Sequence, residues 1–161
     1  MRKVKNPFVA YEGYNCFGCA PGNSLGLRMT FIEEGEEIVS YWEPQKHFQG
    51  YHTILHGGIQ ATLMDEVASW FVYVRLKSAG VTSKAEIRYI KPLHVDRGAL
   101  TIRACLLQMR RNLADISVKI FDNENVLCAE SVMVFFTFPP EKAKDNLYYP
   151  GHENFFDTEE K

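Results

Sequence analysis

Two adjacent glycines and an acid further along the same apolar segment are the residues of this sequence that could do chemistry together. Gly57 and Gly58 stand where a long helix is expected to begin, and Asp65 lies within that helix. Backbone N–H groups at a helix N-terminus carry partial positive charge, and glycine lets a ligand approach them closely. Such donors bind an anion or polarise a carbonyl, and a tuned acid acts as base or nucleophile. The combination predicts acyl transfer.

The same residues also have a purely structural interpretation. Between Gly57 and Val74 the only formal charges are Asp65 and Glu66, and the remaining residues are mostly apolar on all sides of a helix. A helix of that kind is buried, so its carboxylates must be paired, hydrogen-bonded or raised in pKa. An acid that is hydrogen-bonded within the core would meet that condition without taking part in catalysis. The glycines beside Asp65 favour the functional interpretation.

Composition and charge indicate a globular chain without a large excess of positive or negative charge. The 161 residues are 46% hydrophobic and 13% aromatic, and the net charge is −2. These values suit one domain with a real core, and the net charge gives no overall basic field that would point to a nucleic-acid partner. No apolar run is long enough to cross a bilayer, and no signal core follows the basic N-terminus. We therefore expect a cytoplasmic protein with neither a nucleic-acid nor a membrane partner.

Strand patterns lie on both sides of the apolar helix, which is expected over residues 57–77. The expected strands cover residues 27–32, 38–42, 83–89, 100–109, 113–121 and 126–138. One helix is buried all round only if a curved sheet wraps it. The order predicts an α+β hotdog fold, with a six-stranded antiparallel sheet around one long central helix. We expect a single domain over residues 1–161, with a core at about 26–138, an irregular N-terminal segment 1–25 and a C-terminal extension 139–161.

Four short segments carry a family resemblance that extends over residues 14–138. The segments are Leu55–Gly58 with Thr62–Glu66, Cys16–Leu27, Gln49–Tyr51 and Ile87–Pro92. In that order they resemble an HGG…T-L-x-D-E signature, a C-F-x-C-G-P-x-N-x-x-G-L segment of one branch, an H-Q-G-Y loop and an R-Y-x-x-P strand. The chain thus resembles the hotdog-fold acyl-CoA thioesterases of the phenylacetate-pathway type. It departs from the pattern at Ala20, which replaces a glycine, and at Gln49 or Gly50, where other branches carry Asn.

The resemblance implies hydrolysis of an acyl-CoA to a free acid and a thiol. The N–H groups of Gly57 and Gly58 would hold the oxyanion, and Asp65 would act as general base or nucleophile. His56 would either bind near the thioester or serve as a structural cap, and Gln49 would hold the water. No metal and no cofactor is expected beyond the coenzyme A of the substrate.

Substrate contacts are expected from a hydroxyl near the acid and from cations at the entrance. Thr82 is favoured over Ser83 for the hydroxyl, and Glu66, about 100° from Asp65 around a helix, is a secondary or structural acid. Cations would bind the coenzyme A phosphates, although each one alone is equally explained as solvated surface charge. The full set of expected substrate-binding residues is Thr82, Ser83, Glu66, Arg88, Lys91, Arg110 and Arg111.

The spacing of Gly58 and Asp65 predicts a site shared between subunits. At a rise of about 1.5 Å per residue they lie roughly 10 Å apart along one helix, too far for one carbonyl to touch both. Two helices packed antiparallel about a two-fold axis would bring the glycines of one to the acid of the other. We therefore expect a homodimer, or a dimer of dimers, and the resemblance implies the same.

Cys16 and Cys19 form an isolated C-x-x-C pair, most simply interpreted as an ordered turn. A zinc site would need two further ligands, which His52 or His56 could supply, and a redox pair would favour the start of a helix. Two other functions share the expected fold: a hydratase or dehydratase acting on an acyl thioester, and a non-catalytic acyl-CoA sensor.

Overall fold

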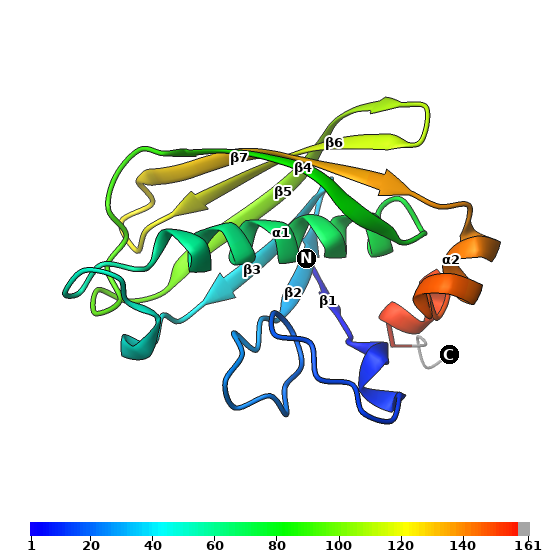
Figure 1. Cartoon of the computed structure of the whole chain (residues 1–161), viewed down its shortest axis with the longest axis horizontal. Coiled ribbons are helices and arrows are strands. Elements are labelled where there is room, and N and C mark those ends of the chain that lie inside the picture. The colour runs from blue at the N-terminus through cyan, green and yellow to red at the C-terminus, as the bar shows by residue number, and fades with distance from the viewer. Residues whose placement is uncertain (158–161) are drawn as a thin grey trace.

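The computed structural model describes residues 1–157 and is built around the helix α1 (Gly57–Val74), which lies along one face of an antiparallel sheet (Figure 1). The sheet has seven strands in the order β1-β2-β3-β5-β6-β7-β4. Their bounds are β1 Arg2–Val4, β2 Phe31–Glu34, β3 Glu37–Trp42, β4 Gly80–Tyr89, β5 Leu100–Arg110, β6 Leu113–Phe121 and β7 Leu127–Thr137. A short helix, α2 (Pro140–Leu147), follows the last strand. This is the predicted α+β hotdog fold.

The prediction of six strands was wrong by one. The additional strand β1 lies in the N-terminal segment that was expected to be irregular, and it pairs antiparallel with β2 from Arg2 opposite Glu33 to Val4 opposite Phe31. Three residues are too few to display an alternating pattern, so no periodicity marked it. β2 itself begins at Phe31, because Arg28 adopts a positive φ of 51° and interrupts the extended chain that was expected from residue 27.

α1 is buried over most of its surface, as its apolar sequence predicted. Leu63, Val67 and Val72 have no exposed area, and Trp70 stacks on Phe31 of β2 with ring centroids 4.4 Å apart. The helix contacts β3, β4, β5, β6 and β7. It ends at Val74, three residues earlier than expected. Within residues 1–157 no helix has both the length and the hydrophobicity to span a membrane.

The C-terminal extension packs over the later turns of α1 (Figure 1). Phe155 is fully buried and stacks against Tyr73 with centroids 5.9 Å apart, and the Tyr149 hydroxyl donates to the Tyr73 carbonyl at 3.0 Å. Residues 158–161 of the expected extension lie outside the described residues. The extension therefore completes the core on the side of the helix that the sheet leaves open.

β4 forms one edge of the sheet and leaves that edge unpaired in the single chain. Its other edge pairs with β7 from Gly80 opposite Thr137 to Tyr89 opposite Ala129. Most of its residues are exposed on both faces, including Val81 at 46% and Tyr89 at 52%. A long exposed edge strand is a template for pairing with another chain, and stable proteins cover it. The fold thus presents a surface suited to a second copy.

Candidate active site

His56 caps the N-terminus of α1. Its Nδ1 accepts the Gly58 N–H at 2.9 Å, and its carbonyl accepts the N–H groups of Ile59 and Gln60, both at 3.0 Å. Because Nδ1 is an acceptor here, the neutral ring carries its proton on Nε2. His56 therefore has the capping role, and its Nε2–H is the donor that remains for a ligand.

This cap changes the prediction for the two glycine donors. The Gly58 N–H donates to the His56 ring, so it is not available to a ligand, although the sequence predicted that it would be. The Gly57 N–H has no acceptor among residues 1–157, and the Gly57 carbonyl accepts the Tyr89 hydroxyl at 2.9 Å. Tyr89 thereby ties the start of α1 to the end of β4. In this conformation Gly57 supplies the available backbone donor of the pair.

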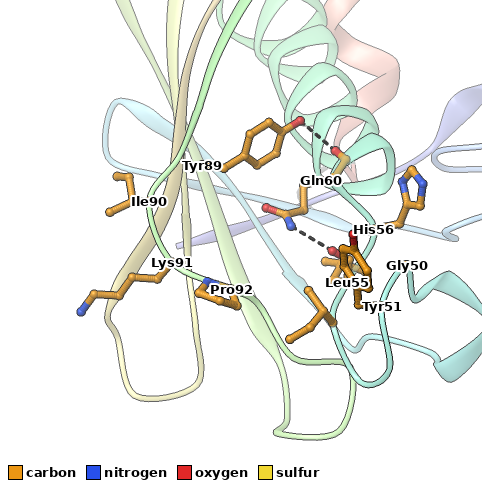
Figure 2. A pocket seen from close by; sticks show the side chains of 11 residues that line it. Gly50, Tyr51, Leu55, His56, Gln60, Tyr89, Ile90, Lys91 and Pro92 are labelled. Atoms are coloured by element: carbon orange, nitrogen blue, oxygen red, sulfur yellow. Dashed lines mark hydrogen bonds between the residues drawn. The ribbon is translucent and has the colours of Figure 1, made fainter.

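A cavity of about 560 Å³ opens beside this helix start (Figure 2). Its lining includes Tyr51, His56, Gly57, Tyr89, Ile90 and Lys91. The Gln60 side chain donates to the Leu55 carbonyl at 3.0 Å and holds the preceding loop against the helix. The volume lies in the range of small-molecule sites, and a ligand within it would meet the Gly57 backbone and the His56 ring.

Asp65 lies two turns further along α1 and faces β4. Its Oδ1 accepts the Thr82 hydroxyl at 2.6 Å, so Thr82 is the hydroxyl that reaches the acid. Ser83 sits at an irregularity in the pairing of β4 with β7, between Thr82 and Lys84. Burial raises the pKa of Asp65, and the Thr82 hydrogen bond opposes that shift. Within residues 1–157 no basic side chain forms an ion pair with Asp65.

The acid and the cavity do not meet within one chain. Asp65 is absent from the residues that line the cavity at the helix start, as the helical spacing predicted. Gln49 accepts the Thr53 N–H at 3.0 Å through its side-chain oxygen and so shapes the loop before α1. A single chain therefore holds a donor end and an acid end that are separate.

The expected cations are spread over the chain. Lys91 lines the cavity at the helix start, whereas Arg88 pairs with Glu130 at 3.4 Å on the sheet. Arg110 binds Asp115 through two hydrogen bonds of 2.6 and 2.9 Å. Arg111 follows in the β5–β6 turn with a positive φ of 59°. That turn lies at the opposite end of α1 from the cavity (Figure 1). Of the four expected cations, Lys91 alone lines the cavity.

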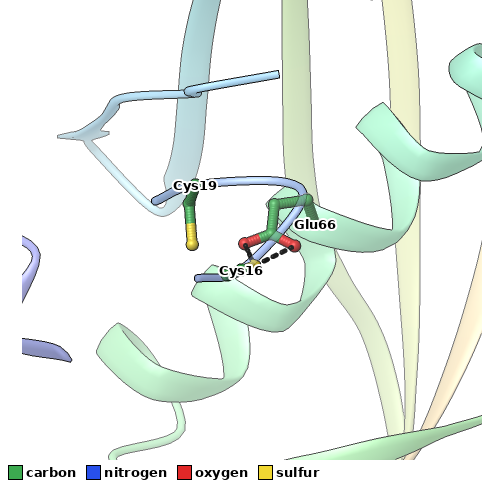
Figure 3. A group of neighbouring side chains, drawn as sticks. All are labelled: Cys16, Cys19 and Glu66. Carbon is green, nitrogen blue, oxygen red and sulfur yellow. Dashed lines mark hydrogen bonds between the residues drawn. The ribbon is translucent and has the colours of Figure 1, made fainter. Parts of the chain in front are cut away.

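Glu66 belongs to a different cluster from Asp65, on the side of α1 that faces the N-terminal segment (Figure 3). Its carboxylate oxygens lie 3.7 and 3.8 Å from the Cys16 sulfur, and Oε1 accepts the Trp70 indole N–H at 3.0 Å. Burial raises the pKa of Glu66 to about 7. The structure thus separates Glu66 from the expected substrate contacts. Sequence reasoning missed its pairing with Cys16; the only signal was its angle from Asp65 around the helix.

The Cys16 and Cys19 thiols differ in their surroundings. Hydrogen bonding with Cys19, together with the backbone N–H groups of Cys19 and Gly18, lowers the pKa of Cys16 to about 5. The hydrogen bond with Cys16 and burial raise the pKa of Cys19. His52 and His56, the further ligands considered for a zinc site, are not part of this cluster, where Glu66 stands instead.

Comparison with known proteins finds similarity to one family over part of the chain. The model of the thioesterase superfamily matches residues 52–129. An uncharacterised protein of Schizosaccharomyces pombe is 36% identical over 64 residues, which cover 38% of this chain and only 37% of that protein.

Two solved structures from streptococci share the fold. A hypothetical thioesterase of Streptococcus pneumoniae, solved with coenzyme A, is 22% identical with a TM-score of 0.64, over 70% of this chain and 87% of that one. The protein smu.793 of Streptococcus mutans, bound to acetyl-CoA, is 17% identical with a TM-score of 0.65, over 81% of this chain and 98% of that one. The matched residues 52–129 include the capped helix start and Asp65, and over this segment the chain is similar to the thioesterase superfamily.

Proposed function

We propose that this protein hydrolyses an acyl-CoA thioester, with the carbonyl bound at the start of α1 and Asp65 of a second copy as general base or nucleophile. The observation that carries the proposal is Asp65 itself, a partly buried carboxylate without a basic partner in residues 1–157, oriented by Thr82. Such an acid is suited to take a proton from water. The coenzyme A and acetyl-CoA in the two streptococcal structures support the ligand class.

The start of α1 offers the donors that the reaction needs. The Gly57 N–H stands at the positive end of the helix, and the His56 Nε2–H lines the same cavity. Either donor would stabilise the negative charge that develops on the thioester oxygen. Glycine at position 57 places no side chain beside that N–H, and the Tyr89 ring lies 3.6 Å from where a Cβ would be.

A second copy would bring the acid to the donors. If two chains pair antiparallel through their β4 edges, the two α1 helices also run antiparallel, and the Gly57 end of one lies toward Asp65 of the other. The same pairing brings the Tyr89 end of one β4 beside the Gly80 end of the other. The β5–β6 turn with Arg111 would then approach the other chain's cavity and its Lys91, where cations would bind coenzyme A phosphates.

The reaction then follows in one of two ways. As a base, Asp65 would remove a proton from a water whose oxygen attacks the thioester carbonyl, and the tetrahedral oxyanion would collapse with release of the coenzyme A thiolate. As a nucleophile, Asp65 would attack the carbonyl itself, displace the coenzyme A thiolate by breaking the carbon–sulfur bond, and form an anhydride that water then hydrolyses. Both routes use the same oxyanion donors and give the free acid and the thiol.

The phenylacetate-pathway subtype is proposed from the sequence motifs, principally His56–Gly58 and Thr62–Glu66. Met64, Trp70 and Phe71 of α1 are buried in the core and do not line the cavity. The aromatic residues that face the cavity are Tyr51 and Tyr89. These two side chains are the ones that an aromatic acyl group would meet.

Thiol release from a panel of acyl-CoA esters tests the proposal. The panel contains phenylacetyl, benzoyl, short straight-chain and medium straight-chain esters, and Asp65→Asn serves as the matched inactive chain. We expect thiol release by the parent on at least one ester and its loss in the variant. Binding of every ester without thiol release would favour a sensor, and interconversion of an enoyl ester would favour a hydratase; either result would contradict hydrolysis.

A further inference from the structure

We propose that Cys16, Cys19 and Glu66 form a binding site for a thiophilic divalent cation of the zinc class, separate from the candidate active site. The two sulfurs and a carboxylate oxygen all lie within 4.8 Å of one another (Figure 3). The cysteines come from the N-terminal segment and the acid from α1, so an ion there would join the two. This inference does not depend on thioester hydrolysis.

The distance between the Cys16 sulfur and the Glu66 carboxylate matches that between two ligands of a tetrahedral ion. With zinc–sulfur bonds of about 2.3 Å and zinc–oxygen bonds of about 2.1 Å, a tetrahedral angle separates sulfur from oxygen by about 3.6 Å. The Cys16 sulfur lies 3.7 Å from Oε1 and 3.8 Å from Oε2 of Glu66. Either oxygen could therefore occupy a coordination position next to Cys16 after a shift of a few tenths of an ångström.

The turn that carries the cysteines is shaped to admit the carboxylate. In this conformation a Cβ on Gly18 would overlap the Glu66 carboxylate, so the acid occupies space that a side chain at position 18 would need. The Ala20 N–H closes the turn on the Cys16 carbonyl at 3.1 Å, and the Met29 N–H binds the Gly18 carbonyl at 2.9 Å. The glycine leaves space for the carboxylate beside the cysteines, and the two hydrogen bonds fix the turn that carries them.

Hydrogen-bond donors surround the ligand atoms. The Trp70 indole N–H donates to Glu66 at 3.0 Å, and the Tyr14 hydroxyl lies 2.9 Å from the Cys19 sulfur. Asn6 binds both the Tyr14 hydroxyl, at 3.2 Å, and the Cys19 carbonyl, at 3.0 Å. Outer contacts of this kind orient metal ligands and are part of a working site.

A cation would also balance the charge of these groups. With both sulfurs ionised, the cluster would hold three negative charges in a partly buried volume, which is costly without compensation. Within residues 1–157, Glu66 forms no ion pair with a basic side chain. A reversible disulfide between the cysteines would not explain why the Glu66 carboxylate lies beside them. The geometry therefore favours a metal over a redox pair.

The site would have one coordination position left for a ligand from outside. All three residues line a cavity of about 580 Å³ between the N-terminal segment, α1 and the end of α2, and Tyr14, Ser69 and Tyr73 line it with them. Three protein ligands leave the fourth position of a tetrahedral ion to water or to another small molecule. The cavity gives that fourth ligand a path to the ion.

Metal analysis of the full chain tests the site directly. The protein is expressed in zinc-supplemented medium, purified with a non-chelating reductant, and analysed for zinc by mass spectrometry. We expect about one zinc per chain in the parent and in Cys105→Ser, a matched cysteine variant on β5. We expect its loss in Cys16→Ser and Glu66→Gln. Gly18→Ala should raise the dissociation constant for zinc by roughly 10- to 100-fold, because it displaces a ligand without removing one.

A spectroscopic measurement on the parent avoids reliance on variants that fail to fold. After removal of zinc by a chelator, addition of cobalt should produce thiolate-to-cobalt charge transfer and the visible bands of a tetrahedral site. Cobalt spectra without thiolate bands would overturn the proposal. So would a parent that contains no zinc above the buffer level, with its cysteines free or joined in a disulfide. Full zinc content in folded Cys16→Ser would place the metal elsewhere and would equally overturn it.

Discussion

The Thr82 hydroxyl donates a 2.6 Å hydrogen bond to the Asp65 carboxylate, and this contact joins the middle of α1 to the open edge strand β4. The acid proposed for catalysis is thus oriented by the same strand that would pair with a second copy. In the proposed dimer, assembly and positioning of the acid would therefore be linked through one strand.

Asp65→Asn should reduce thiol release by about 100- to 10,000-fold, the contribution of a positioned base. Asn is nearly isosteric and its Oδ1 can still accept from Thr82, so the fold should remain. Initial rates on the best ester measure the loss, and near-ultraviolet circular dichroism checks the fold. Asp96→Asn, at an exposed position after β4, is the matched control and should retain full activity. Activity within a few-fold of the parent would remove Asp65 from the mechanism.

The same substitution should stabilise the protein at high pH. Burial raises the pKa of Asp65 in the folded state. The protonated acid therefore favours folding at low pH, and that stability is lost as the pH rises through the folded-state pKa. Asn carries no such charge, so Asp65→Asn should melt above the parent at pH 8, with a smaller difference at pH 4. Thermal unfolding at the two pH values measures it, and a difference independent of pH would contradict the burial of this charge.

Thr82→Val should move the acid limb of the pH profile to higher pH. The Thr82 hydroxyl lowers the pKa of Asp65 against the effect of burial, so its removal leaves burial unopposed and requires a higher pH to ionise the base. The pH dependence of kcat/KM reports this shift. Thr82→Ser keeps the hydroxyl and should retain the parent profile. An unchanged limb in Thr82→Val would mean that another group titrates.

Gly57→Val should lower turnover by roughly 100-fold, comparable to the loss of one oxyanion donor, because the larger side chain blocks the cavity at the free N–H. Gly22→Val is the matched control, since a Cβ at Gly22 meets nothing within 4 Å. Turnover per folded molecule, compared with the melting temperature, separates blockage from unfolding. A folded Gly57→Val chain with parental turnover would show that the carbonyl binds elsewhere.

The sequence was sufficient to predict features that depend on local periodicity. The buried helix, the strands that follow it and the separation of Gly58 from Asp65 all depend on residue spacing along one element. β1 was missed because three residues carry no pattern. The cap of His56 on Gly58 depends on a side-chain rotamer, and the approach of Cys16 to Glu66 depends on how a loop crosses the helix. Neither relation leaves a periodic signal in the chain.

Each proposed site takes its donors from one chain and its acid from the other, and mixing two defective variants tests this arrangement most directly. Asp65→Asn and Gly57→Val chains are combined in equal amounts, allowed to exchange subunits, and assayed for thiol release. In a random mixture half of the dimers are mixed, and each mixed dimer has one site with both parts intact, so activity should recover to about a quarter of the parent value. Exchange without recovery above the two variants measured separately would mean that the site lies within one chain.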